Sequence, residues 1–201
     1  MPITCERFES GMTVEQYQAQ MKQNQAKFAE NMARAAARAK DIAFFAAQPE
    51  PINTLVITED WCGDALANVP VLAKIASETG KLNLRLFLRD QNLDLADQYL
   101  KHGKYRSVPV FVFFDENMRE LGHFIERPDR ATAEMDAIAT QLAAEHPELP
   151  DVGGPFENLS EQGRRLRSAA LGKLREERGD AWTDMLLDEV ETILAGSTAR
   201  Q

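Results

Sequence analysis

The sequence predicts an α/β protein with one mixed sheet and helices on both of its faces. In the middle of the chain, short apolar segments of strand character alternate with segments of helical composition, in the order β-α-β-α-β-β-α. Strands joined through a helix pair in parallel by a right-handed crossover, and the short turn between the last two strands makes a hairpin. Helical composition continues on both sides of this alternating region.

We therefore divide the chain into three parts. An N-terminal helical extension is expected over residues 1–48, the sheet domain over 49–147, and a linker with a C-terminal helical extension over 148–201. The strands are expected where β-branched or alternating apolar residues cluster, at 52–58, 82–88, 108–114 and 121–125. The helices of the sheet domain are expected at 64–77, 93–101 and 129–145.

The N-terminal extension is rich in strong helix formers and carries an apolar stripe at helical spacing. We expect one long helix or two between Thr13 and Ala47, starting at Thr13, with Gln16 three residues later as in a capping box. The segment Gln48-Pro49-Glu50-Pro51 ends it, because proline cannot continue a helix. The stripe consists of Tyr17, Met21, Phe28, Met32, Ile42 and Phe45.

The C-terminal extension follows a stretch rich in proline and glycine at 149–155, and its helical composition begins near Asn158. A break is expected near Gly179-Asp180, before a second amphipathic helix. Its apolar residues are Trp182, Met185, Leu186, Val190 and Leu194. Because exposed stripes of this kind promote aggregation, we expect both extensions to pack on the sheet domain or on their counterparts in a symmetric homodimer, away from Cys62 and Pro109.

Composition excludes several classes of function. The net charge of −9 argues against binding to nucleic acid or to an anionic membrane surface, since phosphate contacts need clustered Lys and Arg. No segment has the apolar length of a membrane span or the pattern of a signal peptide, so a cytoplasmic protein is expected. The two cysteines, Cys5 and Cys62, exclude a disulfide framework, and the scattered His102, His123 and His146 complete no metal motif. No metal or cofactor is expected.

The segment Trp61-Cys62-Gly63-Asp64-Ala65 is the strongest chemical signal. Cys62 follows a predicted strand and opens a predicted helix, so backbone N–H groups and the positive end of the helix dipole would lower the pKa of its thiol. The carboxylates of Glu59, Asp60 and Asp64 would raise it through like-charge repulsion. The sign of the net shift stays open. We expect Cys62 to be solvent-accessible and to react faster than Cys5.

This segment resembles the W-C-G-x-C motif of thioredoxins, with Ala65 in the place of the second cysteine. Pro70 has the spacing of the thioredoxin helix proline, Arg106-Ser107-Val108-Pro109 precedes a strand as the cis-proline loop does, and Gly122 lies in the last strand. Arg127-Pro128 and the E-D-W-C-G-D-A segment are similar to a bacterial thioredoxin-like family. The resemblance covers about residues 50–146.

The resemblance implies a thioredoxin-like fold, with Cys62 as the catalytic thiol. It also implies a cis bond before Pro109 and substrate contacts that we place at Trp61, Gly63, Asp64, Val108 and Pro109. The backbone of Val108 would bind an extended substrate by strand addition.

Two departures from that family limit the chemistry. Ala65 offers no resolving thiol, and Val56 stands where thioredoxins have a buried aspartate that assists proton transfer. One hypothesis is a monothiol enzyme of cell redox homeostasis, in which Cys62 forms a mixed disulfide with a protein or a low-molecular-weight thiol and an external thiol resolves it. The other is a thioredoxin-fold binding module in which Cys62 is incidental. An iron–sulfur carrier is a more distant third, because no glutathione-binding set of residues is recognisable.

Overall fold

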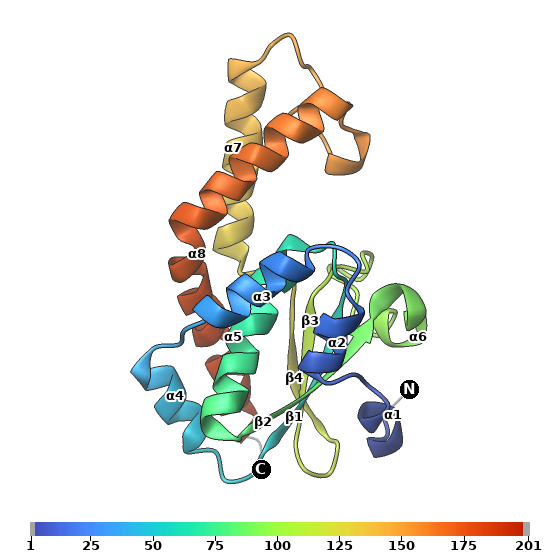
Figure 1. Ribbon diagram of the computed structural model, residues 1–201, viewed down its shortest axis with the longest axis vertical. Helices are drawn as coiled ribbons and strands as arrows, with labels where there is room; N and C mark the ends of the chain where they lie inside the picture. Colours follow the sequence, from blue (N-terminus) through green and yellow to red (C-terminus); the bar gives the residue numbers. More distant parts are fainter. Residues whose placement is uncertain (1–2, 199–201) are drawn as a thin grey trace. The chain divides into compact units, whose positions relative to one another are not determined.

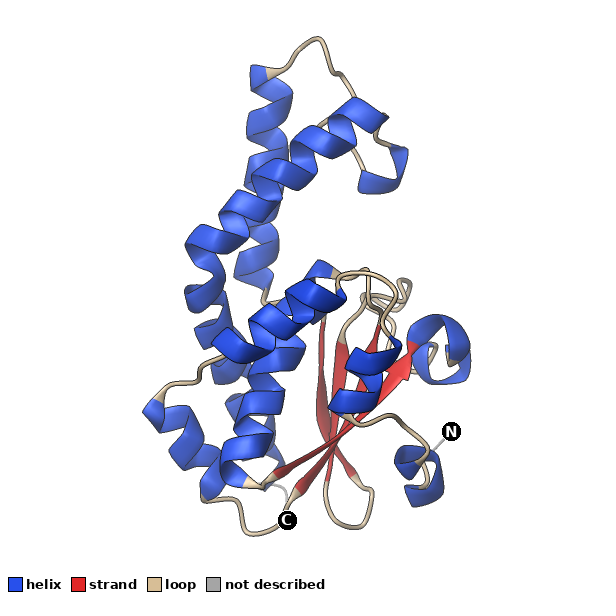
Figure 2. Ribbon diagram, in the orientation of Figure 1, coloured by secondary structure: helices blue, strands red, loops and turns tan. Residues whose placement is uncertain are grey.

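The computed structural model describes residues 3–198 and contains a four-stranded mixed sheet (Figure 1). The strands are β1 Ile52–Thr58, β2 Leu82–Leu88, β3 Val110–Phe114 and β4 Glu120–Ile125, in the spatial order β2-β1-β3-β4. Strand β1 pairs in parallel with β2 and antiparallel with β3, and β3 pairs antiparallel with β4. Helices lie on both sides of the sheet (Figure 2), so the predicted α/β architecture is confirmed.

The N-terminal region differs from the predicted one or two helices. It forms four short helices, α1 Cys5–Glu9, α2 Val14–Gln20, α3 Gln25–Arg34 and α4 Ala39–Ala46. The capping box is confirmed, because the side chain of Thr13 accepts a hydrogen bond from the Gln16 N–H and the Gln16 side chain accepts one from the Thr13 N–H. The chain turns after Met21, where Asn24 adopts a left-handed conformation with φ of 56°. Helix propensity alone did not indicate these turns.

The remaining helices are α5 Gly63–Thr79, α6 Leu93–Ala96, α7 Asp129–Glu145 and α8 Glu161–Thr198, with short 3-10 turns at Arg89–Gln91 and Phe156–Asn158. The expected break near Gly179-Asp180 is wrong, since α8 is continuous through both residues. A single glycine costs a helix only about 1 kcal/mol, and no proline interrupts this one. No helix within residues 3–198 is long and apolar enough to cross a membrane.

The described chain divides into two compact units. The first contains residues 3–126 and 183–198 with the whole sheet, and the second is the helical segment Arg127–Trp182. Within the second unit, the Glu134 carboxylate accepts hydrogen bonds from Arg178 and from the indole N–H of Trp182, each at 2.9 Å. The hydrogen bonds from Arg178 are the largest influence on Glu134 and lower its pKa to about 2. The domain boundaries expected at residues 49 and 147 stay predictions.

Both extensions contribute to the core of the first unit. The side chains of Tyr17, Phe28 and Phe45 are fully buried, and so are those of Leu186 and Val190 near the end of α8. Helix α8 approaches β4 closely at Gly122, where a Cβ atom would lie 2.6 Å from Ile193 Cγ2. The expectation that the apolar stripes pack on the sheet domain is therefore confirmed for these residues. A homodimer stays a prediction.

An ion-pair network joins α4 to α8 in this unit. The buried Asp41 accepts two hydrogen bonds from the Arg38 guanidinium, which also contacts Asp188. Burial opposes ionisation of Asp41, but the hydrogen bonds from Arg38 outweigh it, and its pKa is lowered. Burial and the adjacent Asp41 raise the pKa of Glu191. Lys40 pairs with Asp188 at 2.7 Å, so Arg38 and Lys40 together compensate part of the negative charge of this acidic cluster.

Candidate functional site

Cys62 lies at the junction of β1 and α5. Strand β1 ends at Thr58, and the turn is closed by a hydrogen bond from the Cys62 N–H to the Glu59 carbonyl at 3.2 Å. Cys62 is the N-cap residue of α5, and its carbonyl accepts the first helical hydrogen bond from the Leu66 N–H at 3.0 Å. The sulfur therefore sits where the backbone N–H groups of a helix N-terminus are unpaired and favour a negative charge.

The loop before β3 covers the sulfur. The Val108-Pro109 peptide bond is cis, and the Cys62 thiol donates a hydrogen bond to the Val108 carbonyl at an Sγ–O distance of 3.1 Å. Cys62 is only 7% exposed, whereas Cys5 is exposed. The expectation that Cys62 is solvent-accessible is thus wrong, because the position at the helix terminus does not by itself reveal that a distant loop closes over it.

The two residues that depart from the thioredoxin pattern, Ala65 and Val56, are both buried. Ala65 is 1% exposed and fills the position of the missing second cysteine. Val56 is fully buried in the centre of the sheet, where it pairs with Leu86 on β2 and Phe111 on β3. Neither Cys5 nor Cys62 is in a disulfide, and an apolar side chain replaces the buried acid.

Trp61 is the exposed neighbour of the buried thiol. Its side chain is 44% exposed, and the Arg89 guanidinium lies 5.0 Å from the centre of its ring. Arg89 also donates a hydrogen bond to the Arg106 carbonyl at 3.2 Å. It thereby connects Trp61 to the loop that carries Val108. Gly63 and Asp64 form the first turn of α5, with Asp64 buried at 6% exposure.

Asp60 attaches the turn between α2 and α3 to the Trp61-Cys62 segment. Its carboxylate accepts hydrogen bonds from the backbone N–H groups of Lys22 and Gln23, at 2.8 and 3.0 Å. Its carbonyl accepts another from the Asn24 side chain at 2.9 Å. Sequence reasoning treated Asp60 only as a charge near the thiol, and no local pattern indicates that it caps a turn 37 residues away.

A second attachment comes from α3. Pro70 has no N–H, so the Leu66 carbonyl one turn earlier lacks its usual helical donor. The Asn31 side-chain amide donates to this carbonyl instead, at 2.8 Å. The α2–α3 region therefore supports the start of the helix that presents Cys62. The expectation that the N-terminal extension packs away from Cys62 is wrong, because its side chains and turn are hydrogen-bonded to the residues on either side of the cysteine.

A buried polar group also lies beneath the turn. Glu59 is 8% exposed, and its carboxylate accepts a hydrogen bond from the Asp90 N–H at 2.8 Å. Burial raises the pKa of Glu59. Burial likewise raises the pKa of Tyr17 to about 12, and the Tyr17 hydroxyl lies 3.4 Å from Thr58 Oγ1. Sequence reasoning placed Tyr17 in the apolar stripe and missed its polar contact, although Glu59 could have been suspected because it follows a buried strand directly.

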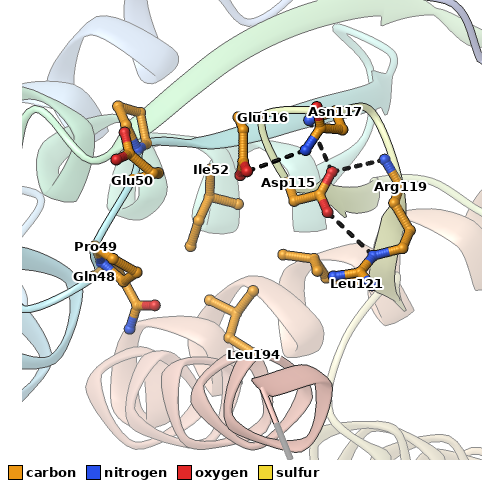
Figure 3. Close-up of a pocket in the computed structure, with 11 residues that line it drawn as sticks. Gln48, Pro49, Glu50, Ile52, Asp115, Glu116, Asn117, Arg119, Leu121 and Leu194 are labelled. Atoms are coloured by element: carbon orange, nitrogen blue, oxygen red, sulfur yellow. Dashed lines mark hydrogen bonds and ion pairs between the residues drawn. The ribbon is translucent and has the colours of Figure 1, made fainter. Parts of the chain in front are cut away.

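A cavity of about 430 Å³ opens at the other end of β1, between the segment 48–52 and the β3–β4 turn (Figure 3). The Asp115 carboxylate there accepts hydrogen bonds from the backbone N–H groups of Asn117 and Arg119 and from the Arg119 guanidinium. These bonds stabilise the turn itself. This cavity adjoins Ile52, the first residue of β1, whereas Cys62 comes after Thr58, the last residue of that strand. The cavity is therefore separate from the thiol site.

Comparisons with known proteins agree with this geometry. A family model described as thioredoxin matches residues 11–141. Among solved structures, an HIV epitope-scaffold is similar over 95% of this chain and 96% of its own, with a TM-score of 0.62 and 16% identity. A protein of unknown function from Pseudomonas aeruginosa is similar over 88% and 99%, with a TM-score of 0.57 and 16% identity.

The search of curated proteins found no match. The two structural similarities, at 16% identity, establish the fold alone. The family model covers well over half of the chain, including β1, the Cys62 turn and the cis-proline loop. The protein therefore belongs to the thioredoxin family.

Proposed function

We propose that the protein carries out monothiol thiol–disulfide exchange through Cys62, with an external thiol as the resolving partner. The observation that carries this proposal is the position of the Cys62 sulfur, at the N-terminus of α5 and 3.1 Å from the Val108 carbonyl beside cis-Pro109. A thiol at a helix N-terminus is in the setting that favours the reactive thiolate.

The first step is loss of the Cys62 proton to solvent. The thiolate no longer donates to the Val108 carbonyl, and the unpaired N–H groups at the start of α5 stabilise its charge. The Val108 carbonyl then becomes free to accept a hydrogen bond from the backbone N–H of an extended substrate. In this mechanism the protonated thiol occupies the carbonyl acceptor that a substrate N–H uses after deprotonation.

The second step is attack of the Cys62 thiolate on one sulfur of a substrate disulfide. The Cys62 S–S bond forms as the substrate S–S bond breaks, and the second substrate sulfur leaves as a thiolate. With Ala65 at the resolving position, the mixed disulfide persists until an external thiolate attacks the substrate sulfur. That attack releases Cys62 as a thiolate and leaves the external thiol in a disulfide with the substrate, so the external thiol is the reductant.

A non-catalytic binding module is the second candidate function. The burial and the hydrogen bonding of Cys62 favour it. Cys62 is only 7% exposed and its thiol is already hydrogen-bonded. If the loop carrying Val108 did not move, the sulfur would not reach a disulfide. The fold would then serve recognition alone.

Intact-mass spectrometry of the Cys5→Ser protein distinguishes the two. The protein is incubated with hydroxyethyl disulfide under native conditions and then with excess 2-mercaptoethanol. We expect one adduct at Cys62 that is stable until the thiol is added and is then removed. The Cys5→Ser/Cys62→Ser protein is the matched control and should stay unmodified. An adduct that forms only after unfolding in guanidinium would contradict the enzyme and favour the binding module.

A further inference from the structure

Three large apolar side chains are strongly exposed on or beside the loops that surround the thiol. They are Trp61 at 44%, Leu93 at 43% and Tyr105 at 54%. Leu93 and Tyr105 line a cavity of about 480 Å³, together with Arg89, Asp97, Lys104 and Arg106. We call this cavity the 89–106 pocket. Exposed aromatic and arginine side chains around a hollow are the composition found at the energetic centres of protein interfaces.

Contacts of Arg89 link the 89–106 pocket to the thiol site. Arg89 stacks on the Trp61 ring at 5.0 Å and donates to the carbonyl of Arg106. Arg106 lies two residues before Val108, whose carbonyl contacts the Cys62 sulfur. Two extended residues span at most about 7 Å, so one short peptide can reach both the pocket and the sulfur.

The charge of the pocket is opposite to that of the chain. Arg106 forms a two-fold hydrogen-bonded pair with Asp97, and Arg89 pairs with Asp90 at 2.8 Å. Lys104 is exposed and lies 5.1 Å from the Tyr105 ring, and within residues 3–198 it makes no ion pair. The pocket thus presents one uncompensated positive charge on a protein whose net charge is −9.

We propose that the 89–106 pocket is a docking surface for an extended segment of a substrate protein, next to the cysteine that Cys62 attacks. An acidic side chain of the segment pairs with Lys104, and an apolar side chain packs on Leu93 and Tyr105. A polypeptide fits this surface better than a small thiol does, because its backbone N–H can donate to the freed Val108 carbonyl and an apolar side chain can cover Leu93 and Tyr105. This inference rests on the proposed exchange at Cys62 and adds the residues that select the substrate segment.

The test is a charge swap with synthetic peptides. Each eight-residue peptide contains one cysteine, activated as a mixed disulfide with thionitrobenzoate, and one apolar residue. Paired peptides differ only in Glu or Lys, placed two, three or four residues from the cysteine. The rate of thionitrobenzoate release by the Cys5→Ser protein is measured at low salt. At the best position, we expect the Glu peptide to react about three to five times faster than the Lys peptide, the range of an exposed ion pair.

Lys104→Glu should reverse this preference, and the ratio of the two peptide rates within one variant cancels any change in basal reactivity. Lys81→Glu is the matched control, because it makes the same charge change at the start of β2, the opposite end from Arg89. It should leave the preference unchanged. Tyr105→Ala should slow both peptides by at least about fivefold.

A Glu-to-Lys rate ratio that is the same in the starting protein and in Lys104→Glu at all three positions would overturn the docking surface. Reaction with hydroxyethyl disulfide reports separately on the exchange itself. If that reaction occurs but the charge preference does not, the exchange stands and the docking surface is rejected. If hydroxyethyl disulfide fails to react, the exchange is rejected.

Discussion

The contact between Asn31 and the Leu66 carbonyl offers a stringent test of how α3 supports the helix that presents Cys62. The Asn31 amide donates to this carbonyl at 2.8 Å because Pro70 has no N–H to offer. Asn31→Ala removes the donor and leaves a part-buried carbonyl without a partner. Pro70→Ala restores a backbone N–H at the position from which the helix would normally supply it.

The two changes should therefore be coupled. A neutral hydrogen bond contributes about 0.5–1.5 kcal/mol, and an unpaired buried acceptor costs about 1–3 kcal/mol. Since the Leu66 carbonyl is only part-buried, we expect Asn31→Ala to lower the free energy of unfolding by about 1.5 kcal/mol. In the Pro70→Ala background the new N–H satisfies the carbonyl, and the same change should cost no more than about 0.5 kcal/mol. The coupling energy is then about 1 kcal/mol.

Urea unfolding of the four proteins of the cycle, followed by circular dichroism, measures this coupling. Removing the proline ring also loses packing. This loss is the same with and without the Asn31→Ala change, so it cancels in the coupling energy. Asn31→Asp is the matched control, because it keeps the size of the side chain but cannot donate, and it should cost at least as much as Asn31→Ala. Additivity within about 0.3 kcal/mol would refute the proposed compensation for Pro70.

Other variants test the ionised groups and the motif. Asp41→Asn should destabilise the protein by about 2 kcal/mol in urea unfolding at pH 7, because it removes the charge that strengthens two hydrogen bonds from Arg38, while Asp188 still pairs with that guanidinium. Glu191→Gln should be neutral or stabilising at pH 7, since the raised pKa of Glu191 means that its ionisation costs stability as the pH rises above about 4.5. Glu134 has a lowered pKa, so its charge stabilises the fold at neutral pH. The advantage of the starting protein over Glu134→Gln, about 1 kcal/mol after solvent screening, should disappear between pH 4.5 and about 2 in pH-dependent unfolding. Ala65→Cys should reduce insulin disulfides faster than the starting protein, with Ala65→Ser as the inactive control; equal rates would show that Ala65 is not what limits dithiol chemistry at Cys62.

The sheet could be predicted because its signals are local. The apolar runs of β1 and β3 are buried on both sides and read as continuous strands, and helix α5 begins at the residue after Cys62, as the motif implied. The thioredoxin resemblance rested on the Cys62 motif together with the proline at 109, and both lie in the region that the family model matches.

The covering of the site could not be predicted because it depends on contacts between distant residues. Nothing near Cys62 in the sequence indicates that the Val108 carbonyl, 46 residues later, accepts a hydrogen bond from its thiol. The same holds for Asn31, whose side chain replaces a helical donor, and for Asp60, which caps a remote turn. Helix propensity also overestimated the length of the N-terminal helices and missed the continuity of α8, since tertiary packing decides where a helix of ordinary composition ends.

The most direct test of the central claim compares the reactivity of Cys62 in the folded and the unfolded chain. In the Cys5→Ser protein, the rate of reaction with hydroxyethyl disulfide at pH 7 is measured natively and in concentrated guanidinium. If the N-terminus of α5 activates the thiol and the loop carrying Val108 yields to a substrate, the native rate should exceed the unfolded rate. A native rate that is lower, and that rises only with the fraction of unfolded protein, would show that Cys62 is a buried residue without a role in exchange.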